Sequence, residues 1–159
     1  MIRIGQSIDI HPLKAGRPLI LGGVEIDNPL GLDGHSDADV LVHAIAESML
    51  GALALGDLGK HFPDTDPKYK GISSMKLLAH VYDLITQKGY CVGNIDSTIL
   101  CEKPKLAPYI LQMRENIAAV LHCPVDTISI KATRGENLGF VGRQEGMCAL
   151  AVCLLEKQA

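Results

Sequence analysis

Two short segments of the chain carry side chains that could bind a metal ion. Asp9 and His11 stand two positions apart in a segment that alternates like a strand, so their side chains point to the same side. His43 lies in an apolar segment with helical spacing. Either motif alone is commonly a polar strand end or a surface histidine, but two imidazoles and one carboxylate together suit a zinc ion with one open position. The sequence therefore predicts a catalytic metal site, with Glu47 one turn beyond His43 orienting its imidazole.

The helix that carries His43 is predicted to begin beside a site for an anion. Ser36, followed three positions later by Asp39 and an apolar run, has the pattern of a capping box and places the first helical residue at Asp37. Free backbone N–H groups and the positive end of the helix dipole attract anions at such a terminus. His35 and Ser36 could contact the same anion, for which phosphate is the first candidate.

The composition indicates one compact domain that spans residues 1–159. A chain of 159 residues suits a single domain, and four Tyr, two Phe and no Trp leave its core to aliphatic side chains and alanine. The net charge is −3 without a basic cluster. Because nucleic-acid binding depends on positive charge, nucleic acid is not an expected partner.

The cysteines and the apolar runs indicate the compartment. There are five cysteines, at positions 91, 101, 123, 148 and 153, and no Cys-x-x-Cys pair, which is typical of a reduced protein. The sequence shows no secretion signal and no apolar run of about 18 residues. We therefore expect a soluble, cytoplasmic protein without a membrane segment.

Hydrophobic periodicity predicts an α+β fold with a mixed sheet and helices on one side. Helices are expected from residue 37, from residue 73 or 74 to Gly89, and over 110–121. Strands are expected over 2–11, 90–101, 126–132 and 147–155, with a hairpin over 18–26 that turns at two glycines. The last strand is apolar at nearly every position, which predicts that both of its faces are covered.

The loops and the motifs that are absent narrow the chemistry. The breaker-rich segment 56–71 is either disordered or functional, and Asp57, Asp64 and Asp66 within it are turn formers unless a ligand is near. No nucleophile elbow, Walker glycine loop, His-Glu-x-x-His or dinucleotide fingerprint occurs. What remains suits phosphoryl transfer by positioning and charge neutralisation, without a covalent intermediate.

Four motifs, in order along the chain, resemble those of the 2-C-methyl-D-erythritol 2,4-cyclodiphosphate synthase family. The resemblance runs from end to end and rests on Gly5-x-x-x-Asp9-x-His11, Gly34-His35-Ser36-Asp37-x-Asp39-x-x-x-His43, Gly56-Asp57-x-Gly59-x-x-Phe62-Pro-Asp-Thr-Asp66 and Gly139-x-x-Gly142-Arg143-x-Glu145-Gly146. It implies a homotrimer with active sites between neighbouring subunits. It also implies an enzyme that converts 4-diphosphocytidyl-2-C-methyl-D-erythritol 2-phosphate to the cyclic diphosphate and CMP, a phosphorus–oxygen lyase of the non-mevalonate isoprenoid pathway.

The resemblance also implies a role for each part of the site. Zinc, or another divalent metal, would be bound by Asp9, His11 and His43, with Ile10 between the first two in the substrate site, and the diphosphate by His35 and Ser36. The erythritol part would be held by Asp57, Leu58, Gly59, Phe62, Pro63, Asp64, Thr65 and Asp66. The cytidyl group would be surrounded on the adjacent subunit by Cys101, Glu102, Lys103, Pro104, Lys105, Leu106, Ala107, Ala132, Thr133, Arg134, Gly135 and Glu136.

Two further implications concern a second cation and the trimer axis. Glu136 would bind a Mg²⁺ or Mn²⁺ ion that bridges the α- and β-phosphates. Phe140 and Arg143 would line the threefold axis and bind phosphate or an isoprenoid ligand.

The chain departs from the family pattern at two places. Ser7 stands where the first motif commonly has a second glycine, and Arg134-Gly135 stands where the family usually has hydroxyl side chains. One of those hydroxyls stabilises the transition state, so Arg134 is expected to act with His35 in catalysis or else to alter the nucleotide contacts. Two alternatives stay open, namely a metal-dependent phosphohydrolase acting on a nucleotide diphosphate and a non-catalytic trimeric binding protein.

Overall fold

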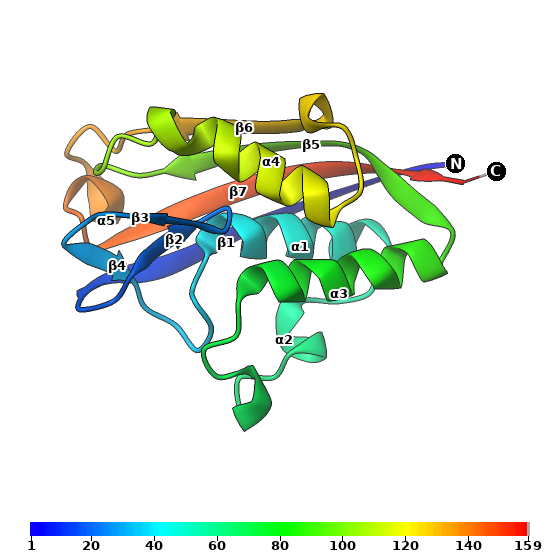
Figure 1. Ribbon diagram of the computed structural model, residues 1–159, viewed down its shortest axis with the longest axis horizontal. Coiled ribbons are helices and arrows are strands. Elements are labelled where there is room, and N and C mark those ends of the chain that lie inside the picture. The colour runs from blue at the N-terminus through cyan, green and yellow to red at the C-terminus, as the bar shows by residue number, and fades with distance from the viewer. Residues whose placement is uncertain (159) are drawn as a thin grey trace.

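A computed structural model describes residues 1–158, which form a sheet with a layer of helices on one face (Figure 1). The five-stranded sheet has the order β4-β1-β7-β5-β6, and its members are β1 (Ile2–Ala15), β4 (Leu30–Leu32), β5 (Tyr90–Leu100), β6 (Ile128–Thr133) and β7 (Gly146–Lys157). β5 and β6 run parallel, whereas the other neighbours are antiparallel. The predicted mixed α+β fold is confirmed.

Three helices cover one face of this sheet. They are α1 (Val40–Ala52), α3 (Ser74–Gln87) and α4 (Ile110–Val120), and α1 packs directly on β1 and β7. Between the layers lie fully buried aliphatic side chains such as Leu41, Ile45 and Met49, as the scarcity of aromatic residues predicts. The remaining helical segments are short, namely α2 (Leu58–His61), α5 (Gly139–Gly142), η1 (Pro67–Tyr69), η2 (Ala107–Tyr109) and η3 (Val125–Thr127).

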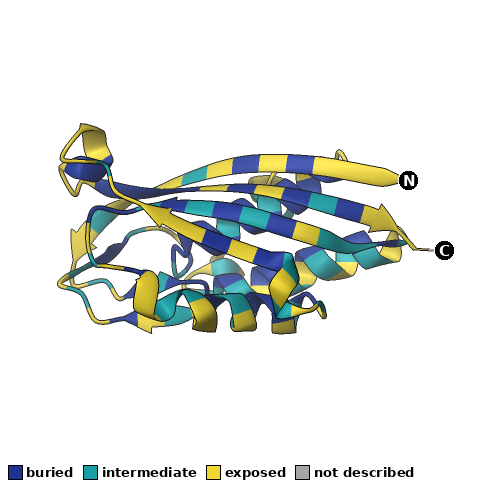
Figure 2. Cartoon of the chain, turned by 90° about the horizontal axis from the view of Figure 1, so that it is seen from above, coloured by how far each residue is buried: buried dark blue, intermediate teal, exposed yellow. Residues whose placement is uncertain are grey.

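The opposite face of the sheet is open in the single chain (Figure 2). Between Ile4 and Lys14 of β1 the exposed side chains are those at even positions, where Ile4 is 69% and Ile8 is 54% exposed. On β7, Leu150 and Val152 are 40% and 48% exposed, so the prediction that both faces of this strand are covered is wrong for one chain. An apolar run along a strand indicates that both faces of the strand have apolar neighbours. Those neighbours can belong to another chain.

The face of β1 toward α1 carries the small and polar residues. Gly5 is buried against α1, and a Cβ atom there would overlap the backbone carbonyl of Ser48. Ser7, Asp9 and His11 follow on the same face because side chains alternate along a strand. The close approach of α1 therefore places the chemistry-bearing side of β1 beneath the helix that carries His43.

Several local predictions can be compared with the elements. β2 (Leu19–Leu21) and β3 (Val24–Ile26) form the predicted hairpin, and Gly22 and Gly23 have positive φ values of 56° and 70°. Gly89, with φ of 76°, follows the end of α3 as predicted. β6 begins two residues later than predicted because residues 125–127 form a short 3₁₀ turn. Within residues 1–158 all five cysteines are free and no helix is long and apolar enough to cross a membrane.

Candidate active site

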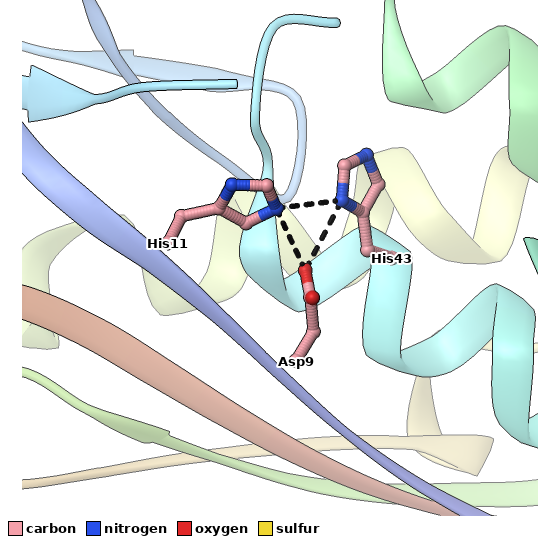
Figure 3. A group of neighbouring side chains, drawn as sticks. All are labelled: Asp9, His11 and His43. Atoms are coloured by element: carbon pink, nitrogen blue, oxygen red, sulfur yellow. Dashed lines mark hydrogen bonds and ion pairs between the residues drawn. The ribbon is translucent and has the colours of Figure 1, made fainter. Parts of the chain in front are cut away.

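Asp9, His11 and His43 meet at one point, as the sequence predicts (Figure 3). The Oδ2 atom of Asp9 lies 3.0 Å from Nε2 of His11 and 3.1 Å from Nδ1 of His43, and the two ring nitrogens are 3.1 Å apart. Asp9 and His11 come from β1 and His43 from α1, so two packed elements hold the set. Each residue thus offers one ligand atom to a common centre, with these atoms within 4.8 Å of one another.

The hydrogen positions around His11 show that this cluster suits a cation. Nδ1 of His11 lies 2.9 Å from the backbone carbonyl oxygen of Asp33. A carbonyl oxygen can only accept, so Nδ1 carries the hydrogen, and in the neutral ring Nε2 presents its lone pair to Asp9 and His43. A lone pair facing a carboxylate at 3.0 Å is unfavourable unless a proton or a metal ion lies between them. The donor set is therefore matched to a divalent metal that prefers imidazole and carboxylate ligands.

The pKa values of Asp9 and His11 shift in the directions expected for a carboxylate and an imidazole that face each other. Burial raises the pKa of Asp9, but hydrogen bonds and charge from His11 and His43 outweigh it and hold that pKa well below its ordinary value. Burial likewise lowers the pKa of His11, yet the nearby Asp9 carboxylate raises it overall. The Asp9 carboxylate is therefore stabilised in its ionised form, in which it can bind a cation.

Helix α1 begins three residues later than predicted. Asp39, which is fully buried, is the N-cap, and its carboxylate accepts a hydrogen bond from the backbone N–H of Val42 at 3.1 Å. It also accepts from the backbone N–H groups of Gly22 and Gly23. A buried carboxylate thus caps the helix at this terminus, and the anion contacts of His35 and Ser36 stay a prediction.

Glu47 does not orient His43, contrary to the prediction. Its carboxylate instead accepts from the Ser7 hydroxyl at 2.6 Å and from the backbone N–H of Leu58 at 3.2 Å. Glu47 therefore ties the start of α2 to β1 and α1. The outer nitrogen of His43 contacts Ser36 and Ser74.

A pocket of about 420 Å³ opens over the three ligands. It brings together several predicted substrate residues, and its lining includes His35, Ser36, Leu58, Gly59, Phe62 and Asp64. It also includes Tyr69, Ile72 and Leu77, which sequence reasoning missed because aromatic and aliphatic side chains in a loop or at a helix start carry no motif of their own. Tyr69 packs edge-on against Phe62 with ring centroids 5.4 Å apart, which closes the outer wall.

Other residues predicted for this part of the site lie outside the pocket lining. Asp57 caps α2 by accepting from the backbone N–H of Lys60 at 2.9 Å, and Asp66 accepts from that of Lys68 at 3.1 Å. Both therefore make the turn contacts that were their alternative interpretation. The side chain of Ile10 is 51% exposed on the open face of β1. Pro63 and Thr65 are exposed and do not line the pocket.

A second pocket, of about 700 Å³, lies where the predicted cytidyl residues meet. Its wall is formed by Cys101, Glu102, Lys103, Pro104, Lys105, Leu106, Ala107, Ala132, Thr133 and Arg134. The parallel pairing of β5 with β6 brings the two segments together, and the backbone N–H of Cys101 donates to the carbonyl of Thr133 at 2.9 Å. Gly135 and Glu136 follow just beyond this lining, and the two pockets share no lining residue within the described chain.

Arg134 already has a partner inside this wall. Its Nη2 donates to Oε1 of Glu102 at 2.7 Å, and the other carboxylate oxygen accepts from the backbone N–H of Gly135 at 2.9 Å. The Arg134 hydrogen bond and charge lower the pKa of the Glu102 carboxyl. Because the Arg134 side chain is 59% exposed, its remaining donors face the pocket mouth and solvent.

The residues predicted for a threefold axis stand just before the start of β7. Phe140 lies in α5 and is 36% exposed. Arg143 follows α5 and donates to both carboxylate oxygens of Glu145, at 2.9 and 3.0 Å. Neither residue lines the two pockets described above.

A family model and several known proteins match this chain over nearly its whole length. The YgbB family model matches residues 2–156. Over 154 residues the chain is 62% identical to the 2-C-methyl-D-erythritol 2,4-cyclodiphosphate synthase of Clostridioides difficile, covering 97% of this chain and 96% of the relative. The synthase of Chlorobaculum tepidum is 60% identical over 155 residues, covering 98% and 99% of the two chains.

Solved structures agree with these relatives. A bifunctional IspDF from Campylobacter jejuni superposes with a TM-score of 0.95 at 42% identity, covering 99% of this chain and 42% of that longer one. A CDP complex of IspF from Plasmodium falciparum has a TM-score of 0.88 at 35% identity and covers 99% and 97% of the two chains.

The fold and the site together define an α+β domain that has one helical layer and an Asp-His-His centre within a pocket. The chain belongs to the YgbB family, whose members named above are 2-C-methyl-D-erythritol 2,4-cyclodiphosphate synthases. The resemblance inferred from four motifs is thereby confirmed.

Proposed function

We propose that this protein converts 4-diphosphocytidyl-2-C-methyl-D-erythritol 2-phosphate to 2-C-methyl-D-erythritol 2,4-cyclodiphosphate and CMP. The observation that carries the proposal is about 60% identity over the full chain to synthases of that name, with the Asp9, His11 and His43 ligand set in place. The reaction makes the protein a phosphorus–oxygen lyase. Five free cysteines support a reduced, cytoplasmic setting.

The proposed chemistry needs no nucleophilic side chain. The substrate's own 2-phosphate attacks the β-phosphorus, and its second pKa of about 6 leaves it largely anionic near neutral pH. The bond from the β-phosphorus to the bridging oxygen breaks, and CMP leaves. Alignment within one molecule can lower such a barrier by about 7–11 kcal/mol, so the protein's main task is to bend and hold the substrate.

The pocket over the ligands supplies that positioning. Zinc, or another divalent metal held by Asp9, His11 and His43, would neutralise charge on the diphosphate and polarise it when bound. His35 and Ser36, at the pocket wall, are proposed to donate to the same diphosphate. Leu58, Gly59 and Phe62 to Asp66 are proposed to hold the erythritol part. Among these, Leu58, Gly59, Phe62 and Asp64 line the pocket.

The 700 Å³ pocket is proposed to bind the cytidyl group. Two structures in the family carry CDP, and this pocket is formed by the two segments that the resemblance assigned to the nucleotide. Residues 101–107 and 132–136 would surround the base and ribose. Glu136 would hold Mg²⁺ or Mn²⁺, which would supply positive charge to the diphosphate, and Arg134 would stabilise the charge that builds during transfer.

We further propose that the active protein is a homotrimer with sites shared between subunits. The open apolar sheet face, which includes Ile4, Ile8 and Val152, would be covered in that assembly. The two pockets have separate linings in one chain, which a shared site explains if each metal pocket meets a neighbour's cytidyl pocket. Phe140 and Arg143 would then stand near the axis, where phosphate or an isoprenoid could bind.

Product analysis tests the reaction. Purified protein would be incubated with the cytidyl substrate, Mg²⁺ and Zn²⁺, and the products followed by ³¹P spectroscopy. Formation of a cyclic diphosphate together with CMP is the expected result. A linear phosphate product would instead indicate the metal-dependent phosphohydrolase, and no turnover with an intact fold would indicate a binding protein.

A further inference from the structure

The outer nitrogen of His43 lies in a buried chain of hydrogen bonds that the proposed reaction does not use. Nε2 of His43 is 2.7 Å from the Ser74 hydroxyl oxygen, and that hydroxyl contacts Oδ1 of Asp37 closely. Ser74 is fully buried at the start of α3. Asp37 also accepts from the backbone N–H of Ser74 at 2.9 Å, so two contacts join these residues.

The number of available hydrogens determines which group donates in each of these hydrogen bonds. A hydroxyl has one hydrogen, and the Asp37 carboxylate can only accept, so the Ser74 hydrogen goes to Asp37. The contact between Ser74 and His43 must then use the hydrogen on Nε2. The opposite tautomer of His43 would leave one of the two Ser74 contacts without a hydrogen, which is costly in a buried place.

We propose that Ser74 and Asp37 are positioning residues that hold His43 in the tautomer with hydrogen on Nε2 and a free lone pair on Nδ1. Nδ1 is the atom that lies 3.1 Å from Asp9 and 3.1 Å from His11. The metal proposal requires this lone pair, so the inference rests on the proposed metal site and extends it beyond the three ligands. Partners of this kind orient metal-binding imidazoles and raise their basicity.

The same arrangement accounts for two other observations. Ser73, the N-cap of α3, makes no side-chain capping bond, and the Asp37 carboxylate accepts from the first helical N–H in its place. Ser36, 3.2 Å from Nε2, accepts from the backbone N–H of Ala38 and need not donate to the ring. Its own hydroxyl hydrogen is then free for a ligand in the pocket that Ser36 lines.

Nitrogen-15 NMR of the histidine rings in the metal-free protein tests the tautomer directly. At about pH 8, where an ordinary imidazole is neutral, His43 should show hydrogen on Nε2 in the wild type, although Nδ1 also faces the Asp9 carboxylate at 3.1 Å and that contact favours the other tautomer. Ser74→Ala should shift His43 toward a mixture of tautomers, and Asp37→Asn should shift it in the same direction by less because one acceptor oxygen is kept. Hydrogen on Nδ1 in the wild type, or no change in Ser74→Ala, would overturn the proposal.

Zinc affinity, measured by competition with a chelator, is the second readout. Ser74→Ala should bind zinc about 10–100-fold more weakly than the wild type. Ser73→Ala is the matched control at the same helix start, and its affinity should stay within about threefold of the wild type because its side chain makes no capping bond. Equal losses in both variants would indicate only a weakened helix start. Failure of the wild type to bind zinc would refute the proposed metal site, while the tautomer measurement would still test the positioning role.

Discussion

The two pockets of this chain differ in what builds their walls. The pocket over Asp9, His11 and His43 takes its ligands from β1 and α1, two long elements packed against each other. The second pocket, which we propose binds the cytidyl group, is built mainly by the segments that end β5 and β6 and follow them, where Arg134 is mostly exposed and bound to Glu102. Groups on packed regular elements are held more firmly than groups on loops. The Asp9, His11 and His43 cluster is therefore organised within one chain, whereas in the proposed trimer the second pocket would meet a neighbouring subunit.

The largest expected effect on activity comes from substituting the proposed metal ligands. His43→Ala and Asp9→Asn should lose zinc and lower activity by on the order of 10³-fold or more, because a bound metal stabilises transferring phosphate by several kcal/mol. The fold should survive, since the aliphatic core does not depend on the three ligands. Metal analysis, circular dichroism and sedimentation would be measured for each variant. Global unfolding on chelation of the wild type would show instead that the metal is structural.

A complementation experiment tests whether the proposed metal site and the proposed nucleotide site of one active site come from different subunits. His43→Ala and Glu136→Ala should each be inactive alone, and an equimolar mixture of the two should regain about a quarter of wild-type activity once subunits have combined at random. Each shared site needs an intact His43 from one subunit and an intact Glu136 from its neighbour. Half of the subunits provide each residue, so about a quarter of the sites are complete. Mass spectrometry would first confirm subunit exchange. Absence of any recovered activity after exchange would refute the shared site.

Arg134 tests whether the loop-built wall also acts on the reacting phosphates. Arg134→Ala should lower kcat by about 10²–10³ with little change in KM, the scale for one lost preorganised donor. Arg134→Thr should recover part of the loss. A rise in KM with unchanged kcat would mean that Arg134 serves only to hold Glu102 in the nucleotide wall.

The smallest expected effect is a pH-dependent contribution to stability from the Glu102–Arg134 pair. Arg134 lowers the pKa of Glu102 below its ordinary value of 4.5, so the folded state favours the ionised carboxylate. Its contribution is present above about pH 4.5 and is lost as the pH falls through the lower folded-state pKa. The stability difference between wild type and Glu102→Gln, measured by denaturant unfolding, should shrink over that acid range.

The exposed Arg143–Glu145 pair offers the control for this measurement. Glu145→Gln removes the same charge from a pair in which both side chains are more than half exposed, at 60% and 55%. Solvent screens such a pair, so its stability difference should be smaller at every pH. A Glu102→Gln difference that stays constant with pH would contradict the ion-pair explanation.

Much of the site could be predicted because the spacing of its residues determines which face of a strand or helix their side chains occupy. The Asp-x-His spacing on a strand places Asp9 and His11 on one face, and the two segments that the resemblance assigned to the nucleotide do line one pocket. The contacts of Glu47 and Asp39 were predicted wrongly. Both carboxylates are used by backbone N–H groups from distant segments, at Leu58 and at Gly22 and Gly23, and local spacing does not report such partners.

The sequence by itself determined the family, the candidate ligand set of Asp9, His11 and His43, and the α+β class, because each depends on residue types at short spacings or on period-two and period-3.6 alternation. Only the tertiary structure determined which groups donate hydrogen bonds to each carboxylate. Asp37 and Ser74 are 37 residues apart and meet because α3 returns to the start of α1. Such pairings follow from the packing of whole elements, and packing is set by the sum of many buried contacts that no single motif records.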